Sequence, residues 1–352
     1  MGRWSSVELL RILSMFLVVI LHFNHWGINP DILEMEGNLT VGNSIGHLFE
    51  SISIVAVNVF ILISGYFGIH FKVRGVLKLF LMCFCWGLIS YLLWCVCGHH
   101  PIGKSLLARV LAFTQNKWWF IIAYLYLYFA SPLLNVAIDH LDRKKYLLVL
   151  FLYAFSTLYI GYVRNMGDND IGMSFAQFVL LYLIGRFINR HYPLDVLRKN
   201  RPRLVLGWTI CTAITFGLAI LNQGWLHLRI DFLRPYVYNS PWVIGASVCL
   251  LCIFLSFSFK SKLVNTVSGS VLSAYLLQES CYWGHQCLYP AAPSIFGTSG
   301  LFLKYFLLLL VSFLFLCACV LVDLLLKKAV YEPVLRFYDK KLLSKEKELI
   351  SF

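Results

Sequence analysis

The sequence predicts an all-α protein, a polytopic bundle of about ten transmembrane helices with both termini in the cytoplasm. Of its 352 residues, 59% are hydrophobic and only 13% are charged. The apolar residues gather in runs long enough to cross the hydrocarbon layer of a bilayer, which takes about 20 residues. Most of the 30 Lys and Arg residues fall in alternate loops, on the side of the N-terminus, and an excess of basic residues marks the cytoplasmic side. This composition excludes a soluble enzyme.

The predicted spans follow the apolar runs along the chain. They cover residues 5–27, 48–68, 76–97, 118–137, 146–162, 173–190, 204–222, 241–258, 267–289 and 302–326. We treat residues 1–326 as one transmembrane domain and residues 327–352 as a basic cytoplasmic tail. The tail alternates apolar and charged residues, which predicts an amphipathic surface helix, with a solvated end as the alternative. The first run contains Glu8 and Arg11 and lacks a small-residue cleavage site, so it is expected to be retained rather than removed as a signal peptide.

The net charge of +13 indicates a partner for the inner loops. The basic residues are dispersed over several of these loops without a nucleic-acid-binding motif, so no nucleic-acid partner is expected. Anionic lipid headgroups match the distribution better. The loop of residues 28–47 has the opposite character, with Asp31, Glu34 and Glu36 and no basic residue. We therefore expect a multi-pass protein of the inner (plasma) membrane, with this loop outside.

The first span contains three ionisable residues, Glu8, Arg11 and His22, and such residues in a membrane typically mark a pathway or a reaction site. Eleven residues of helix return to within roughly 20° of the same face, so Arg11 and His22 share a stripe roughly 16 Å long. Arg11 could hold an anionic ligand, and His22 could act as a general base. The structural alternative is an ion pair between Glu8 and Arg11, with His22 bonded to a neighbouring helix. His25 is expected at the outer interface.

The second span and the loop after it contain further polar groups. Ser64 and Tyr66 end an apolar segment, where helix packing is the favoured interpretation because no base and orienting acid accompany the serine. Lys72, Arg74 and Lys78 follow on the inner side. Together they could bind a polyphosphate, and membrane-surface anchoring is the alternative for each.

Two later spans complete the set of candidates. Trp118, Trp119 and Phe120 open the fourth span, which is typical of an interfacial aromatic belt. Tyr275, Gln278 and Glu279 form a polar cluster in the ninth span that could face His22 or a sugar hydroxyl, or could hold helices together. The remaining histidines lie in loops or at helix ends without metal-ligand spacing, so no metal site is predicted.

Three motifs resemble those of a known family. The first span has Arg11, ten residues and then His22; the segment Val59–Tyr66 is similar to the pattern Phe-Phe-x-x-Ser-Gly-Tyr; and the segment from Trp119 to Asn135 resembles a Trp-Phe pair followed by a Tyr-rich stretch that ends in Ser-Pro-Leu-Leu-Asn. In their order along most of the chain, these motifs resemble acyltransferase family 3, bacterial membrane proteins that O-acylate surface and secreted glycans.

The resemblance implies transfer of an acyl group, commonly acetyl, from cytoplasmic acyl-CoA to a hydroxyl of an extracytoplasmic or lipid-linked sugar of a cell-surface glycan. Arg11 and His22 fall on the family's essential pair, so we expect them to be catalytic. The predicted CoA-binding residues are Arg11, Lys72, Arg74 and Lys78, and the predicted substrate-binding residues are Glu8, Ser64, Tyr66, Trp119, Tyr275, Gln278 and Glu279.

The chain departs from the family pattern in two places. Where the family often has Tyr-x-x-x-His, the sequence has Tyr275 followed by Gln278 and Glu279, so any role of that histidine is either lost or taken over by Gln278 and Glu279. Paired arginines after the second helix are replaced by Lys72, Arg74 and Lys78, which keep the charge but lose the bidentate geometry.

A transporter or exporter of a polysaccharide or small anion is the alternative function, with the Arg11 and His22 stripe as a proton or anion path. We see no clear internal repeat and expect few helix interruptions at mid-membrane, and both observations disfavour the common transporter designs. For the enzyme, two roles for His22 stay open: general base and covalent acyl carrier.

Overall fold

The computed structural model describes residues 4–30, 32–33, 35, 38–98, 118–164, 166, 171–226, 234–297 and 300–350, without the side chains of residues 225–226 and 342–350. The described helices, with π-helical segments labelled η, are α1 (Ser5–His22), η1 (Phe23–Ile28), α2 (Val41–Ser53), α3 (Ala56–Phe67), α4 (Val73–Cys97), α6 (Trp119–Asp139), α7 (Arg143–Ser156), η2 (Thr157–Val163), α8 (Phe175–His191), α9 (Leu194–Lys199), α10 (Arg201–Leu221), η4 (Asn222–Leu226), α11 (Pro241–Leu255), α12 (Lys262–Val267), α13 (Leu272–Gln278), η6 (Gly284–Leu288), α14 (Tyr289–Phe296), α15 (Leu301–Leu326), η7 (Lys327–Tyr331) and α16 (Glu332–Ile350).

The all-α prediction is confirmed: these ranges contain no strand. Seven helical runs among the described residues are long and apolar enough to cross a membrane, which makes the chain a multi-pass membrane protein. They are Ser5–Ile28, Val41–Phe67, Val73–Cys97, Trp119–Asp139, Arg143–Val163, Arg201–Gly224 and Leu301–Lys341. Helix α11 is apolar but shorter, with 15 residues. The expected count of ten spans therefore stays a prediction.

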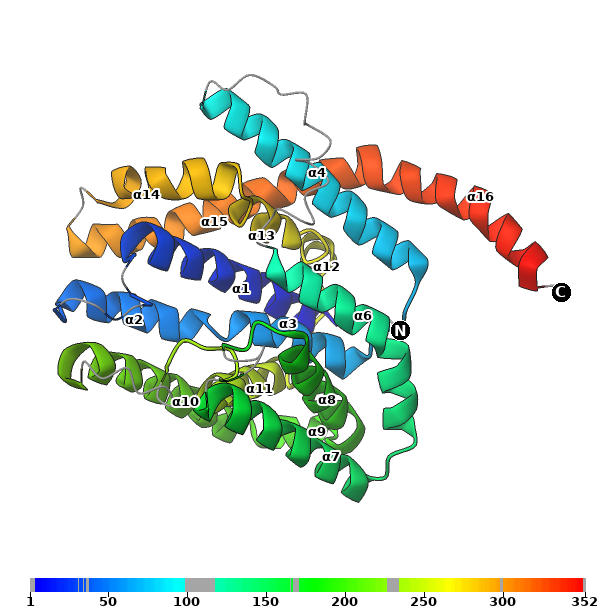
Figure 1. The fold of residues 1–352 in the computed structure, drawn as a ribbon, viewed down its shortest axis with the longest axis horizontal. Helices are drawn as coiled ribbons and strands as arrows, with labels where there is room; N and C mark the ends of the chain where they lie inside the picture. The colour runs from blue at the N-terminus through cyan, green and yellow to red at the C-terminus, as the bar shows by residue number, and fades with distance from the viewer. Residues whose placement is uncertain are drawn as a thin grey trace.

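Helix α1 lies at the centre of the bundle (Figure 1). It contacts α2 and α3 on one side and α13 and α15 on the other, and it also touches α11 and α12. Leu10 and Val19 are fully buried. A helix that is apolar around most of its circumference is stable when other helices surround it, and this position puts any reactive group on α1 in the core.

Helices α3 and α8 approach each other closely at two glycines. A Cβ atom at Gly65 would lie 2.9 Å from the Cα atom of Tyr182, and one at Gly185 would lie 2.7 Å from the backbone nitrogen of Tyr66. Small residues allow this backbone contact, which drives helix association in membranes. The pair forms a tightly packed wall beside α1.

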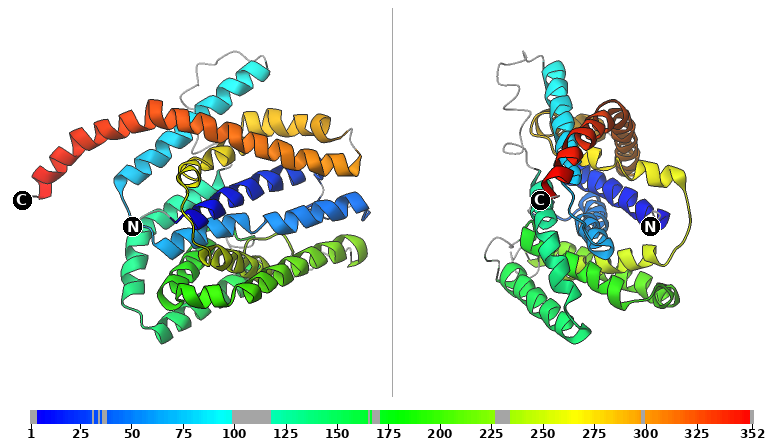
Figure 2. Two further views of the ribbon diagram at one scale, coloured as in Figure 1. Left: turned by 180° about the vertical axis from the view of Figure 1, so that it is seen from behind. Right: turned by 90° about the vertical axis from the view of Figure 1, so that its right-hand side faces the viewer.

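The start of α1 and the end of α16 lie toward the same end of the bundle (Figure 2). The cytoplasmic location of both termini stays a prediction. The tail is helical: α16 continues from α15 through η7 without a break, and the apolar run within it covers 41 residues, from Leu301 to Lys341. The boundary at residue 326 is thus not a break in the helix. The place of α16 on the membrane surface stays a prediction. Asp31, Glu34 and Glu36 lie outside the described residues.

The prediction of one continuous helix over residues 267–289 is wrong. Helix α13 ends at Gln278, and the chain then turns before entering η6 and α14. Gly284 permits the turn, because a side chain there would overlap the carbonyl oxygen of Gln278. Backbone N–H groups of the turn are bonded inside the protein: that of Gly284 donates to Ser280 Oγ (3.0 Å) and that of Trp283 to Ser90 Oγ (3.2 Å). Non-helical backbone at membrane depth requires this kind of internal satisfaction.

Candidate active site

His22 ends α1 and points toward the turn that follows α13. Its Nδ1 atom lies 3.3 Å from Oε1 of Gln278 and 3.5 Å from Oε1 of Glu279, and its side chain is 12% exposed. Gln278 is fixed in turn, since its Nε2 atom donates to the carbonyl oxygen of Val19 (3.2 Å). Both acceptors lie at Nδ1, so the neutral imidazole carries its proton there and has its lone pair on Nε2. This is the tautomer that a general base needs.

The carboxylate of Glu279 is held from three sides. Besides His22, it accepts a hydrogen bond from the hydroxyl of Tyr289 (2.6 Å), and Oε2 lies 3.5 Å from Nε2 of His285. Glu279 itself is 8% exposed. A buried carboxylate needs such partners, and a carboxylate at Nδ1 of a histidine orients the ring and stabilises the imidazolium that forms in proton transfer.

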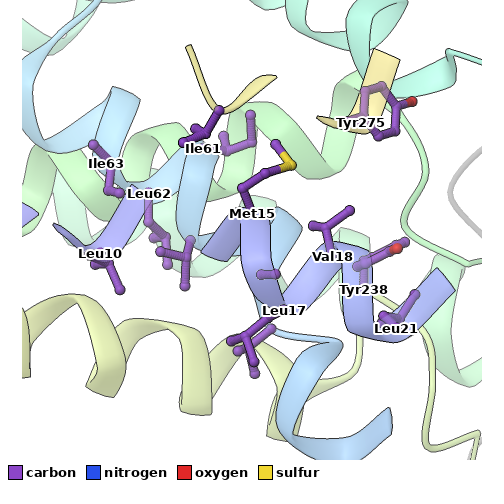
Figure 3. Close-up of a cluster of buried hydrophobic side chains, with 14 of the residues drawn as sticks. Leu10, Met15, Leu17, Val18, Leu21, Ile61, Leu62, Ile63, Tyr238 and Tyr275 are labelled. Atoms are coloured by element: carbon purple, nitrogen blue, oxygen red, sulfur yellow. The ribbon is translucent and has the colours of Figure 1, made fainter. Parts of the chain in front are cut away.

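A small cavity lies beside His22. It is lined by three residues of α1, two of α3, the first two of α6, and three from the loop before α11 and from α13: Met15, Val18, His22, Val57, Phe60, Trp119, Phe120, Tyr238, Leu272 and Tyr275. Figure 3 shows Met15 and Val18 on α1 with Tyr238 and Tyr275 beside them. An apolar wall with a few polar groups is typical of a small-molecule site.

Arg11 lies on the same face of α1 as the cavity, because steps of four, three and four residues lead from Arg11 through Met15 and Val18 to His22. Its Nη1 atom lies 3.2 Å from each carboxylate oxygen of Glu8. The ion pair of the structural alternative is therefore present. The Arg11 side chain is nevertheless 33% exposed, against 9% for Glu8, so it remains accessible to a ligand.

The inner basic residues are arranged around the first turn of α4. The backbone N–H of Lys72 donates to the hydroxyl of Tyr128 (3.0 Å), whose ring lies 6.4 Å from that of Tyr124. Tyr124 lies near both Arg11 and Ser64. The two tyrosines thus connect Lys72 with Arg11.

Arg74 and Lys78 extend this basic surface along α4. Lys78 lies one turn beyond Arg74 and is half-buried. Arg74 points to the C-terminal helix, where its Nε atom lies 3.2 Å from both carboxylate oxygens of Asp339. Arg74 therefore already holds an anionic group of this chain.

Three predicted substrate-binding residues, Glu8, Ser64 and Tyr66, lie outside the cavity. Glu8 pairs with Arg11, as described above. The hydroxyl of Ser64 donates to the carbonyl oxygen of Phe60 in its own helix (3.0 Å). Tyr66 is buried beside Trp4, with ring centroids 6.1 Å apart. The packing interpretation fits Ser64 and Tyr66 better than a binding role does.

The prediction of an interfacial belt at the start of α6 is wrong. Trp118 is 2% exposed, and Trp119 and Phe120 line the cavity. The ring of Phe120 packs against Phe60 (6.2 Å) and Tyr275 (6.0 Å). The aromatic rings are buried in the protein, not exposed at the membrane interface, because apolar side chains of α3 and α13 give them a protein surface to pack against.

His25 is buried, so the prediction that places it at the interface is also wrong. It is 6% exposed, and its Nδ1 atom lies 3.3 Å from Oε1 of Glu50. Asn24 donates to the other carboxylate oxygen of Glu50 (2.8 Å). The His25 ring lies 5.7 Å from that of His22. The α2 helix begins at Val41, seven residues before the predicted span, and this places Glu50 inside the bundle.

Sequence reasoning missed His285 and Tyr289, the two further partners of Glu279. They follow it by six and ten residues, a spacing that brings them to the carboxylate only because the chain turns after Gln278. The turn also contradicts the expectation of few helix interruptions. The polar run Gln278, Glu279, Ser280 inside an apolar segment was the available signal. No group of three or more metal-ligating side chains converges among the described residues.

Comparison with known proteins identifies the family. The model of the family described as "Acyltransferase domain" matches residues 4–326, from the start of α1 to the end of α15. No curated protein and no solved structure matches the chain significantly. The matched range contains His22, Glu279 and every residue of the cavity. The chain therefore belongs to acyltransferase family 3, the family that its motifs predict.

Proposed function

We propose that the protein is a membrane O-acyltransferase that moves an acyl group, most simply acetyl, from cytoplasmic acyl-CoA to a sugar hydroxyl of an extracytoplasmic or lipid-linked glycan. One observation carries the proposal: His22 is held at Nδ1 by Gln278 and Glu279 while it lines an apolar cavity in the bundle core. Membership of an acyltransferase family supports the reaction class.

The reaction needs one base at the reacting atoms. Nε2 of His22 takes the proton of the acceptor hydroxyl, the acceptor oxygen bonds to the thioester carbon, and the carbon–sulfur bond breaks. The thiolate then takes the proton back from His22, so that no net proton is produced. Glu279 stabilises the imidazolium between these two transfers. Direct transfer needs one step fewer than a covalent acyl-histidine, which would use the same Nε2 lone pair and is the alternative course.

The donor would enter from the end of the bundle where α1 begins. In this proposal Arg11, Lys72, Arg74 and Lys78 bind the CoA phosphates, since the first residues of both α1 and α4 carry cations at that end. Arg11 lies roughly 16 Å from His22 along the helix axis, and Met15 and Val18 occupy the face between them. An extended pantetheine arm along this apolar face would bring its thioester to His22.

The acceptor would approach from the opposite end of α1, where η1 meets η6 and α14. The exposed indole of Trp26 lies 5.9 Å from the ring of His285 and 6.1 Å from that of Tyr289. Both neighbours contact Glu279. An aromatic face beside hydrogen-bonding groups suits a sugar ring, whose C–H groups pack on aromatic rings while its hydroxyls are bonded at their edges.

The test is acyl-CoA-dependent thiol release by the purified protein in proteoliposomes that contain a glycan acceptor. General base catalysis contributes about 10²–10⁴-fold to rate, so His22→Ala should lose activity by about that factor. His140→Ala is a matched control, because His140 is exposed at the end of α6 and contacts only backbone among the described residues. Full activity of His22→Ala would sink the assignment. Glycan analysis of the host surface with and without the gene would then identify the ester.

The break after α13 favours one second candidate, a transporter or exporter of a polysaccharide or small anion. Interrupted helices at mid-membrane build the binding sites of many transporters, and here the break places Glu279 against His22. The same proteoliposomes distinguish the two functions. Solute flux without thiol release would favour the transporter, whereas thiol release that depends on the acceptor would favour the enzyme.

A further inference from the structure

We propose that the hydroxyl of Tyr275 and the N-terminus of α6 form the oxyanion site of the transfer reaction, which makes Tyr275 a catalytic residue. The inference rests on the proposed function and adds to it the group that stabilises the reacting carbonyl oxygen. A thioester carbonyl becomes negatively charged when the acceptor oxygen bonds to its carbon. The protein needs hydrogen-bond donors at that position.

The first observation is an unpartnered, buried hydroxyl on a residue that lines the cavity. Tyr275 is 6% exposed, and its hydroxyl makes no hydrogen bond to any group in the described part of the chain. Buried polar groups are nearly always bonded, so an exception calls for an explanation. The ring lines the same cavity as His22, with centroids 6.4 Å apart.

The second observation is the start of α6 beside that hydroxyl. The first N–H groups of a helix have no acceptor within the helix, and Trp118, at the N-cap, provides no side-chain bond. The N–H groups of Ile121 and Ile122 bond to the carbonyl oxygen of Trp118. The backbone of Phe120, the second residue of α6, lies near the Tyr275 hydroxyl. The positive end of the α6 helix dipole also attracts an anion to the start of α6.

The residues that carry the two donors and the base line one cavity. Trp119, Phe120, Tyr275 and His22 all line it, and most of the remaining lining is apolar. Hydrogen bonds to a charged oxygen are stronger in such surroundings than in water. In the proposed step Tyr275 keeps its proton and donates a hydrogen bond to the oxyanion. When the carbon–sulfur bond breaks, the carbonyl re-forms and His22 gives its proton to the thiolate.

A packing role for Tyr275 makes a different prediction. Its ring contacts Phe120 and His22, and Tyr275→Phe keeps these contacts while it removes the hydroxyl. If the hydroxyl stabilises the oxyanion, kcat for acceptor-dependent thiol release should fall by about 10²–10³-fold. KM for acyl-CoA should stay unchanged, because the donor's ground state does not need the bond. The thermal midpoint should not fall, since the lost hydroxyl had no partner.

Tyr146→Phe is the matched control. Tyr146 is also fully buried, but its hydroxyl donates to the carbonyl oxygen of Leu183 (2.8 Å), between α7 and α8 and outside the cavity. This variant should lower the thermal midpoint and keep kcat. The two tyrosines therefore separate loss of a catalytic donor from loss of a structural one.

The outcomes separate this inference from the proposed function. If wild-type protein releases no thiol from acyl-CoA, the proposed function fails. If wild type is active and Tyr275→Phe retains more than about a third of its kcat, or loses thermal stability in step with kcat, the oxyanion role fails while the enzyme stands. Should the phenylalanine variant not accumulate, 3-fluorotyrosine at position 275 keeps the shape and has a stronger donor. It should raise kcat, and an unchanged kcat would contradict the role.

Discussion

Removing the charge of Glu279 tests how strongly the site depends on one carboxylate. In Glu279→Gln, the bond to Tyr289 can persist through the amide oxygen, but the imidazolium of His22 loses its counter-charge. Two unit charges 3.5 Å apart attract by roughly 5 kcal/mol at an effective dielectric constant of about 20. At about 1.4 kcal/mol per factor of ten in rate, that is an upper limit of roughly 10³-fold.

The expected effect is somewhat smaller than this limit. His22 is only partly charged in the transition state, and Gln278 remains at Nδ1. We therefore expect kcat to fall by about 10²–10³-fold with KM for acyl-CoA unchanged. The assay is acceptor-dependent thiol release by purified protein in proteoliposomes, normalised to the folded fraction measured by thermal denaturation.

Glu50→Gln is the control for this experiment, because Glu50 also pairs with a histidine, His25, at 3.3 Å but does not line the cavity. It should lower stability and keep kcat per folded molecule. The reasoning is refuted if Glu279→Gln keeps more than about a third of the wild-type kcat, or if Glu50→Gln loses as much as Glu279→Gln does.

Two further predictions concern packing and donor binding. Gly65→Ala forces α3 and α8 apart and should lower the free energy of unfolding by about 1–3 kcal/mol, as measured by thermal denaturation in detergent. Gly217→Ala is the control and should not lower it, because a Cβ atom there meets no other atom within 4 Å. An equal loss of stability in both variants would contradict the prediction. Asp339→Asn frees Arg74 for the CoA phosphates and should lower KM for acyl-CoA by up to about fivefold, since an exposed ion pair is worth at most about 1 kcal/mol. The control Asp195→Asn breaks another exposed ion pair, at 3.0 Å, and should leave KM unchanged. An unchanged KM in Asp339→Asn would show that Arg74 does not bind the donor.

The sequence predicts the helical class and the position of His22 well, because both depend on local patterns. Apolar runs specify helices, and an ionisable residue in such a run is visible without a structure. The spacing of Arg11 and His22 is enough to place them on one face. The polar cluster at Tyr275, Gln278 and Glu279 is visible for the same reason, and the structure brings all three to His22.

The parts that the sequence does not predict depend on contacts between distant segments. An apolar run has the same composition whether it continues as a helix or turns back, so the turn after Gln278 and the contacts of His285 and Tyr289 are hidden. Tryptophan is common both at membrane interfaces and in buried sites. The residue type of Trp119 therefore does not show which of the two locations it occupies. The pair of His25 and Glu50 depends on where α2 begins, and helix ends are the least certain part of a sequence-based prediction.

The contact between His22 and the turn after α13 joins residues that are 256 positions apart. Synthesis at the membrane produces α1 first, and the carboxylate and amide that orient its histidine emerge only after most of the chain has been made. Until then, the histidine has neither its fixed tautomer nor the α13 wall of its cavity. If the proposed function holds, chemistry at this site is thus coupled to completion of the polypeptide, and a chain that ends before Gln278 should not consume acyl-CoA through it.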